Sequence, residues 1–303
     1  MDGFVAEKLG RKEVEQARPT VSPKNKLNDL TASEWINRTV SVFVQKGHGR
    51  HSSEARFEKE HPAPFSYSDI IRFIEMFTKR GETVLDPFSG IGSTLKACAV
   101  TGRRGLGVEL NPRFAELTRQ RLAAELPPLG LNACEQRLLQ GDARVVLPPL
   151  ETGSVDFAVT SPPYWGILNK IDHKARQERL AVGRDHNYGE DAADLAHIER
   201  YEDFITEIGG VFDATARVLR KGRYLVVIVG DFRHKERYYM FHSDLAAELQ
   251  RRGTFGLRGI TIIHQKFKRV FPYGYPHSFV PNIHHQYAMV FQRVGGGADA
   301  NEV

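Results

Sequence analysis

Short apolar runs alternate with amphipathic stretches over most of the chain. Seven runs rich in Val, Ile and Leu have the length of strands and are bounded by glycine, acidic or proline-containing turns. They lie at 83–85, 105–109, 137–140, 155–160, 223–230, 257–265 and 286–293. Segments with helical spacing of apolar residues lie between them, at 67–79, 94–100, 112–125, 201–219 and 243–252, with Ser68 and Ser243 as expected N-caps and Gly102, Gly222 and Gly253 as expected stops. This alternation predicts an α/β fold: a Rossmann-like, seven-stranded, mostly parallel sheet with helices on both faces.

The same pattern predicts one principal domain over residues 60–293. Residues 1–59 are polar and lack sustained periodicity, so we expect an N-terminal arm or small cap there, and residues 294–303 form a flexible tail. The longest apolar run, 224–229, is far too short to span a bilayer, and the N-terminus lacks the apolar core of a signal peptide. We therefore expect a soluble, cytoplasmic protein. Cys98 and Cys134 are the only cysteines, and they support neither a disulfide framework nor a zinc cluster.

Three of the predicted strands end at or beside a carboxylate. The first leads into Asp-Pro-Phe-Ser-Gly-Ile-Gly-Ser at 86–93 and then a helix, a strand–turn–helix corner typical of nucleotide binding. Glu109 ends the second strand, and Asp142 follows the third. Each acid alone is commonly a helix N-cap, but three at successive strand ends favour a shared ligand site. Leu95 stands where a dinucleotide fingerprint needs its third glycine, which argues against a nicotinamide enzyme.

The segment Thr160-Ser161-Pro162-Pro163-Tyr164-Trp165 follows the fourth predicted strand. Two consecutive prolines lack backbone N–H groups and have a fixed φ, so their carbonyls and the Ser161 hydroxyl form a rigid, acceptor-rich edge beside an aromatic ring. Such an edge suits the exocyclic amino group of a stacked base. Taken alone, the hexapeptide is equally consistent with a proline turn that exposes an aromatic pair.

Taken in order, these motifs resemble those of the S-adenosylmethionine-dependent DNA amino-methyltransferases, which methylate N4 of cytosine or N6 of adenine. Segment 86–93 resembles the family's cofactor loop, and 161–164 its catalytic motif. His-Pro-Ala-Pro-Phe at 61–65 resembles the segment that closes over the cofactor, and 285–291 resembles the terminal strand. The resemblance covers roughly 60–293, identifies this region as a methyltransferase domain and implies that the last two strands pair antiparallel.

The resemblance also implies S-adenosyl-L-methionine as cofactor and a flipped-out base as target. In that interpretation Glu109 is the ribose acid, Asp142 the adenine contact, and Tyr164 stacks on the extruded base. The implied catalytic residues are Ser161, Pro162, Pro163 and Tyr164. The implied cofactor-binding residues are Phe65, Asp86, Pro87, Phe88, Gly90, Gly92, Ser93, Glu109, Leu110, Asp142 and Ala143.

Positive charge is concentrated after the catalytic motif. The whole chain carries +5, but residues 220–293 contain 13 Lys and Arg against 4 Asp and Glu, and aromatic residues alternate with basic ones over 267–275. This favours double-stranded DNA as partner, contacted by loops at 166–200 and 266–284. The expected contacts are Trp165, Lys170, Lys174, Arg176, Arg233, Lys266, Lys268, Arg269, Tyr273 and Tyr275. His277, His284 and His285 have no acid or cysteine at ligand spacing, so no metal is expected.

Ser161 separates the two possible target bases. Family members with Asp or Asn at this position resemble N6-adenine enzymes, whereas serine resembles the N4-cytosine variant. We therefore expect a site-specific N4-cytosine DNA methyltransferase, with N6-adenine as the alternative and a cognate restriction endonuclease as a further expected partner. Only about ten residues follow Arg293, so target reading must fall to loops and the N-terminal arm. That leaves open an RNA amino-methyltransferase, or a non-catalytic nucleic-acid-binding subunit.

Overall fold

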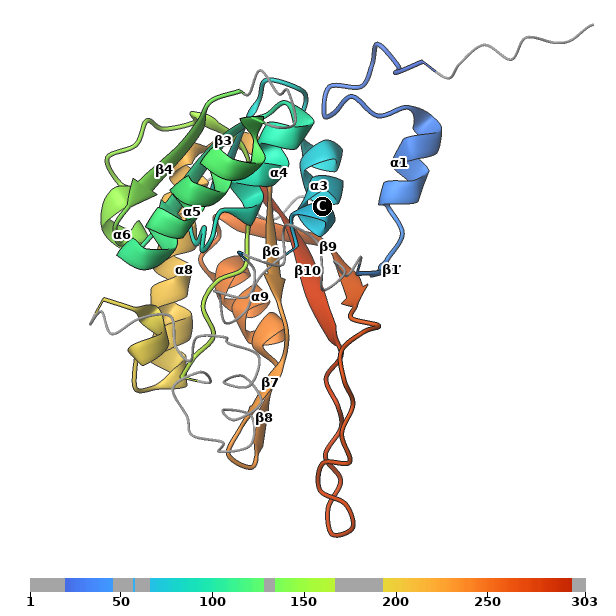
Figure 1. The fold of residues 1–303 in the computed structure, drawn as a ribbon, viewed down its shortest axis with the longest axis vertical. Helices are drawn as coiled ribbons and strands as arrows, with labels where there is room; N and C mark the ends of the chain where they lie inside the picture. Colours follow the sequence, from blue (N-terminus) through green and yellow to red (C-terminus); the bar gives the residue numbers. More distant parts are fainter. Residues whose placement is uncertain (1–19, 46–56, 58–65, 128–133, 167–192, 296–303) are drawn as a thin grey trace, which may run out of the picture.

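The computed structural model describes residues 20–45, 57, 66–127, 134–166 and 193–295, and its main sheet carries helices on both faces (Figure 1). The sheet has eight strands in the order β1-β9-β10-β6-β5-β2-β3-β4. Their bounds are β1 Val42–Val44, β2 Thr83–Asp86, β3 Arg104–Glu109, β4 Gln136–Gln140, β5 Val155–Thr160, β6 Leu219–Val229, β9 Phe255–His264 and β10 His285–Arg293. A separate hairpin joins β7 Phe232–His234 to β8 Arg237–Tyr239. The helices are α1 Ala32–Arg38, α3 Tyr67–Phe77, α4 Ser93–Thr101, α5 Pro112–Glu125, α6 Ala143–Val146, α8 Tyr201–Val218 and α9 Phe241–Arg251, with a 3-10 turn η2 at Leu195–His197.

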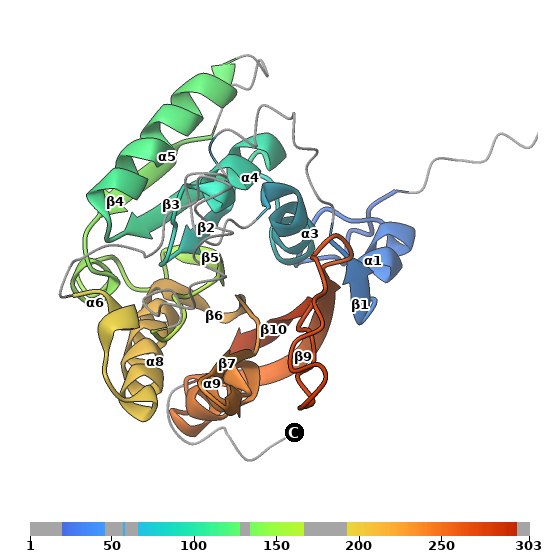
Figure 2. The same ribbon diagram turned by 60° about the horizontal axis from the view of Figure 1, so that its bottom comes forward.

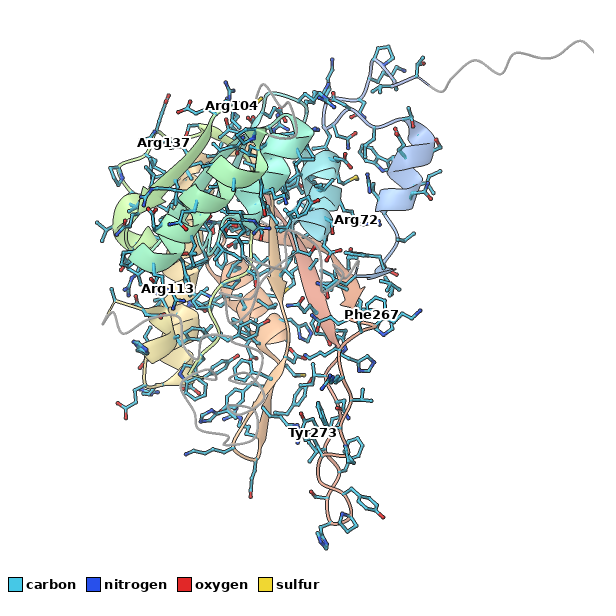
Figure 3. The ribbon with its side chains drawn as sticks, viewed as in Figure 1. Arg72, Arg104, Arg113, Arg137, Phe267 and Tyr273 are labelled. Carbon is cyan, nitrogen blue, oxygen red and sulfur yellow. The ribbon has the colours of Figure 1, made fainter. Side chains whose placement is uncertain are left out.

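All strand pairs of the main sheet are parallel except those made by β10, which runs antiparallel to both β6 and β9. The mostly parallel sheet and the antiparallel last pair are therefore confirmed. Strand order reverses at β2, which lies between β3 and β5. In such sheets the crevice beyond the carboxyl ends of these strands is the usual ligand site. Arg104 and Arg137, near the starts of β3 and β4, mark the opposite edge (Figure 3).

The central strands bury side chains on both faces. In β2, Val84 belongs to the cluster formed with α3 and α4, and the next residue, Leu85, belongs to the larger cluster formed with α8 and α9. The same alternation holds in β6 for Val226 and Val227. A strand period of two with both faces apolar is what a doubly covered sheet requires, and it explains why these runs are continuously hydrophobic. The turned view in Figure 2 shows α8 and α9 on one side of the sheet, with α3, α4 and α5 on the other.

The main sheet contains one strand more than the seven expected. Strand β1, in the segment expected to be an arm or small cap, pairs in parallel with β9. The same segment contains α1, which begins at a capping box formed by Thr31 and Glu34, and Asn28 donates to the Met76 carbonyl oxygen of α3 at 2.6 Å. Polar side chains thus fix this segment against the domain, which is why no apolar periodicity announced it.

Three of the predicted helix ends are wrong. Ser66, not Ser68, is the N-cap position of α3, and α9 begins at Phe241 after Met240 instead of at Ser243. The fully buried Phe241 ring fixes the start of α9 in the core. Gly222 lies inside β6 and stops no helix, because α8 passes directly into that strand. Two glycine stops are confirmed by left-handed backbone: Gly102 caps α4 at φ 72°, and Gly253 follows α9 at φ 69°. None of the described helices is long and apolar enough to cross a membrane.

Candidate active site

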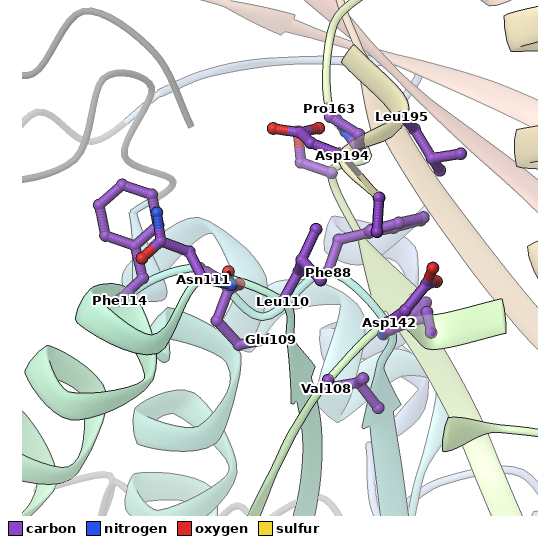
Figure 4. Close-up of a pocket in the computed structure, with 16 residues that line it drawn as sticks. Phe88, Val108, Glu109, Leu110, Asn111, Phe114, Asp142, Pro163, Asp194 and Leu195 are labelled. Atoms are coloured by element: carbon purple, nitrogen blue, oxygen red, sulfur yellow. Dashed lines mark hydrogen bonds between the residues drawn. The ribbon is translucent and has the colours of Figure 1, made fainter. Parts of the chain in front are cut away.

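A pocket of about 740 Å³ lies beyond the carboxyl ends of β2, β3, β4 and β5 (Figure 4). It combines apolar walls with the carboxylates of Glu109, Asp142 and Asp194. The lining residues are Pro87, Phe88, Gly90, Val108, Glu109, Leu110, Asn111, Phe114, Gly141, Asp142, Ala143, Ser161, Pro163, Ala193, Asp194 and Leu195. The predicted cofactor loop and the predicted catalytic motif therefore face the same space.

Asp86 shapes this pocket from behind and is not among the residues that line it. Its buried carboxylate accepts hydrogen bonds from the hydroxyls of Thr94 at 2.5 Å and Thr160 at 2.6 Å, and from the Phe88 N–H at 3.1 Å. Burial raises the pKa of Asp86, while these three donors oppose the rise. The side chain thereby ties the end of β2, the start of α4 and the end of β5 into one unit.

Two further residues of the predicted cofactor loop lie behind the pocket. Gly92 has φ 73° and precedes α4 directly, and a Cβ atom there would lie 2.5 Å from the side chain of Thr118. The left-handed backbone and the close approach both require glycine. The buried Ser93 hydroxyl accepts from Arg121 at 3.1 Å. Pro87, Phe88 and Gly90 are the members of the loop that line the pocket.

Glu109 is held at the pocket wall by backbone groups. Its carboxylate accepts from the Gly90 N–H at 2.7 Å and the Asn111 N–H at 2.8 Å. Burial raises the pKa of Glu109 to about 7, against the opposing effect of these two N–H groups. A carboxylate with two fixed donors still has lone pairs left, so it can accept hydrogen bonds from ligand hydroxyl groups.

Asp142 is the N-cap of α6 and lines the pocket beside Ala143. It accepts from the Arg144 backbone N–H at 2.8 Å and pairs with the Arg144 guanidinium at 2.7 Å. Arg144 also donates to the Ala193 carbonyl oxygen at 2.7 Å, which connects this corner to the segment containing η2. The same pairing raises the pKa of Arg144.

The predicted catalytic motif begins where β5 ends. Ser161 and Pro163 line the pocket, and Pro162 is buried behind them. The Tyr164 hydroxyl accepts from the Gly230 N–H at 2.8 Å and also hydrogen-bonds the Gln286 side chain, while the ring packs on Phe232 and Phe241. Burial raises the pKa of this phenol. Strand ends of β5, β6 and β10 therefore position the motif together.

Trp165 belongs to an aromatic cluster and is not a free surface ring. Its indole N–H donates to the Ile198 carbonyl oxygen at 2.8 Å, and its ring contacts Tyr201 and Tyr239. Arg233, on the β7–β8 hairpin, lies over the Tyr238 ring. The two residues expected to contact nucleic acid thus also stabilise the hairpin next to the motif.

The segment 265–284, here called the finger, contains the other described residues expected to contact nucleic acid. It leaves the end of β9, projects beyond the body of the protein and returns into β10 (Figures 1 and 3). Its exposed members include Lys266, Lys268, Arg269, Tyr273 and Tyr275. The remaining expected site residues, Phe65, Lys170, Lys174 and Arg176, lie outside the described residues.

Two groups of residues at the site were not anticipated. Asn111, the N-cap of α5, and Phe114 belong to the pocket, and the Asn-Pro pair at 111–112 carried a helix-start signal that could have indicated them. Asp194, which caps η2, comes from a stretch without periodicity, and no sequence signal placed it there. In the second group, Asp231 follows β6 and accepts from Nδ1 of His242 at 2.6 Å.

The residues present fit an adenosine-like ligand that carries an amino-acid part. Apolar groups such as Phe88, Leu110 and Pro163 offer faces for a purine ring, and Glu109 offers acceptors for ribose hydroxyls. Carboxylates at the wall suit a cation better than a phosphate. The fold and this donor set define an S-adenosylmethionine-dependent methyltransferase.

Comparisons with known proteins agree with this class. The family model described as DNA methylase (N6_N4_Mtase) matches residues 7–120. Type II methyltransferase M.BslI of Bacillus sp. (strain NEB-606) is 45% identical over 67 residues, which are 22% of this chain and 7% of the relative. Type II methyltransferase M.BglI of Bacillus subtilis is 29% identical over 101 residues, 33% of this chain and 26% of the relative.

Among solved structures, a DNA modification methylase of Thermus thermophilus, complexed with S-adenosyl-L-methionine, is 26% identical with a TM-score of 0.35, over 54% of this chain and 55% of that one. The chain spans less than a third of the length of the curated relatives it matches first. The chain belongs to the S-adenosylmethionine-dependent DNA amino-methyltransferase family.

Proposed function

We propose that the protein transfers the methyl group of S-adenosylmethionine to the N4 amino group of a cytosine flipped out of duplex DNA. The observation that carries this proposal is the position of Ser161, which lines the same pocket as Glu109 and Asp142. A hydroxyl at the head of the motif can accept from the cytosine amino group or donate to the adjacent ring nitrogen. An ionised Asp could only accept.

The work of the protein in this proposal is positioning. The Ser161 hydroxyl and the Pro162 carbonyl accept hydrogen bonds from the amino group, which localises its lone pair toward the methyl donor. The bound cofactor supplies the activated methyl group. Because the proton can leave after the methyl group has arrived, no strong base is required, and proximity can supply on the order of 7–11 kcal/mol of the barrier.

The surroundings of Tyr164 support the rigidity that such positioning needs. Its hydroxyl is fixed by Gly230 and Gln286, and its ring is held at 5.8 Å from Phe241. A ring fixed in this way can offer a flat surface to an extruded base without losing side-chain entropy at that moment. The Thr160 hydroxyl bond to Asp86 likewise fixes the residue before Ser161.

The proposed substrate is double-stranded DNA, and two features support it. The finger joins basic and aromatic side chains beside the pocket edge, and the related proteins M.BslI and M.BglI are named Type II methyltransferases. A DNA substrate would place the enzyme in the interior of a prokaryotic cell. N6 of adenine is the alternative target. A cognate restriction endonuclease stays a prediction, which cleavage assays at the mapped methylation site can test.

Mass spectrometry of nucleosides tests the proposal. Genomic DNA incubated with the enzyme and labelled cofactor should yield labelled N4-methylcytosine, and sequencing that detects modified bases should map the site. Ser161→Ala should lower the methylation rate about 10²-fold, because one fixed polar contact to the reacting group is lost. Its cofactor affinity should stay nearly unchanged. Ser154→Ala, which removes a hydroxyl bonded to Glu151 near the other end of β5, is the matched control.

Other outcomes divide the alternatives. Label in N6-methyladenine would reverse the choice of base and keep the family chemistry. Label in RNA alone would overturn the substrate class. An intact protein that binds the cofactor but labels no nucleic acid would be the non-catalytic subunit.

A further inference from the structure

The finger lies at the same edge of the sheet as the active site. Strand β10 is antiparallel to both β6 and β9, so β6 and β9 run in the same direction. The carboxyl end of β9, where the finger begins, is therefore on the side of the carboxyl ends of β5 and β6. In Figure 1 the finger and the β7–β8 hairpin both extend from this side, with the finger reaching further from the body. Anything bound across the active-site edge would meet the finger.

The finger is a built structure with a fixed tip. At its base the Gln265 N–H donates to the His284 carbonyl oxygen at 2.8 Å. Midway, Asn282 joins the two legs, because its side chain accepts from the Phe271 N–H at 2.9 Å and donates to the Phe271 carbonyl oxygen at 2.8 Å. This amide takes the place of a backbone ladder. The legs are thereby held together up to the last turn.

A tight turn closes the tip. The N–H groups of His277 and Ser278 both donate to the Gly274 carbonyl oxygen, at 2.8 and 2.7 Å. Gly274 has φ 77°, and a Cβ there would lie 2.3 Å from the Ser278 carbonyl oxygen, so only glycine fits. A turn with these constraints presents its side chains in a defined direction.

The tip presents large aromatic rings to solvent. Tyr275 is 81% exposed and Phe279 is 87% exposed, the two highest values among the exposed large hydrophobic residues described. The legs carry Lys266, Lys268 and Arg269, and residues 265–284 contain no Asp or Glu. An apolar tip on an acid-free basic stem fits a polyanion that also offers apolar surface. Duplex DNA has both, since phosphates lie outside and base faces inside.

We propose that the finger is a wedge whose Tyr275 and Phe279 rings enter the base stack beside the target nucleotide and hold it open. This inference rests on the proposed DNA methylation and adds a role that general phosphate contact does not have. Basic side chains on the legs bind the backbone and set the depth of entry. The rings at the tip replace the stacking that the target base loses when it turns into the pocket. A second copy of this chain or a lipid surface would use the same rings for a different purpose.

The test compares two duplexes that contain the mapped methylation site, one with a paired target base and one with the target mispaired. A mispaired base is already easier to extrude. The double variant Tyr275→Ala/Phe279→Ala should methylate the paired duplex at least about 10-fold more slowly, since each lost base–aromatic stack is worth roughly that factor or more. On the mispaired duplex it should stay within about threefold of the wild type. Wild-type enzyme, but not the variant, should raise the fluorescence of 2-aminopurine placed next to the target.

Phe267→Ala is the matched control, because it removes an exposed phenylalanine from the leg of the finger and leaves the tip intact. Its ratio of rates on the two duplexes should equal that of the wild type. If the tip variant slowed both duplexes equally, the finger would be an ordinary contact surface and not a wedge.

A variant that methylates both duplexes normally would also overturn the wedge. Loss of self-association in sedimentation would then assign the tip to an interface between copies, and loss of binding to vesicles of anionic phospholipid would assign it to a membrane surface. Absence of methylation by the wild type on either duplex would overturn the proposed function itself, and the wedge with it.

Discussion

The pocket and the finger bind by opposite physical means. The pocket carboxylates are fixed by hydrogen bonds: Glu109 by two backbone N–H groups and Asp142 by Arg144. The finger holds its cations and rings in solvent, and its internal hydrogen bonds serve only to keep its legs and tip in place.

This contrast separates two kinds of affinity. A buried site with fixed partners should bind a small ligand with little dependence on salt, because few ions are displaced. An exposed basic arm should bind a polyanion with strong salt dependence, because counterions are released. One enzyme can thus retain its cofactor while it moves from one DNA segment to another.

The largest expected effect comes from opening the closed region at Asp86. Asp86→Ala leaves the Thr94 and Thr160 hydroxyls and the Phe88 N–H without their shared acceptor, which should cost on the order of 2–4 kcal/mol of unfolding free energy. Cofactor affinity should fall at least about tenfold, because the loop and the catalytic motif lose their common anchor. Calorimetric titration and thermal unfolding measure both quantities.

Asp86→Asn is the control for this change. Its amide fills the same space and keeps one oxygen as an acceptor, so it should lose less stability than the alanine variant. A folded Asp86→Ala protein with unchanged cofactor affinity would show that the pocket does not depend on this residue.

The finger should respond to charge instead. Lys266→Ala/Lys268→Ala/Arg269→Ala should weaken DNA binding and flatten the plot of log affinity against log salt by up to about 3, close to one per lost phosphate contact. Cofactor binding should be spared. The matched control removes three exposed cations from the opposite edge of the sheet, Arg104, Arg137 and Lys221. Equal slopes in the two triple variants would place the DNA surface elsewhere.

The smallest expected effect is a pH dependence confined to the pocket. Burial raises the pKa of Glu109 to about 7 from 4.5, so the folded protein binds a proton there that the unfolded chain releases. The stability of the cofactor-free protein should therefore fall as pH rises from about 4.5 through 7. Cofactor affinity should change in the opposite direction, rising up to about tenfold between pH 6 and 8, because ribose hydroxyls need the ionised acceptor.

Glu109→Gln should make the cofactor affinity independent of pH over this range. Glu151→Gln, at an exposed position, should leave the wild-type profile in place. A wild-type affinity that stays flat from pH 6 to 8 would contradict the ribose role of Glu109.

The sequence predicted the α/β class, the antiparallel last pair and a site at the strand ends because each has a local signal. Apolar runs with acids at their ends are visible without any tertiary information, and parallel strands bring such ends to one edge. The pattern could not separate an acid that faces the ligand from one that holds the walls. Glu109 and Asp86 both follow from a strand-end acid, yet Glu109 lines the pocket and Asp86 is fully engaged behind it.

Other features depend on partners far away in the chain. Strand β1 has only three residues in a polar segment, and it exists because β9 offers an edge to pair with. Asp194 reaches the pocket through η2 and through the contact of Arg144 with Ala193. The shape of the finger depends on one side chain, Asn282, which acts as a ladder bond between legs that carry no strand signal.

The place of β10 within the sheet has a consequence for biosynthesis. This strand is late in the chain, but it lies between β6 and β9 and pairs with both. Until the ribosome has released residues 285–293, β6 keeps one edge without its partner, and that edge is among the most hydrophobic parts of the protein. A nascent chain at this stage carries a nearly finished cofactor pocket beside an adhesive strand. Chaperone protection during that interval would therefore matter more for this strand than for any of the strands that build the pocket.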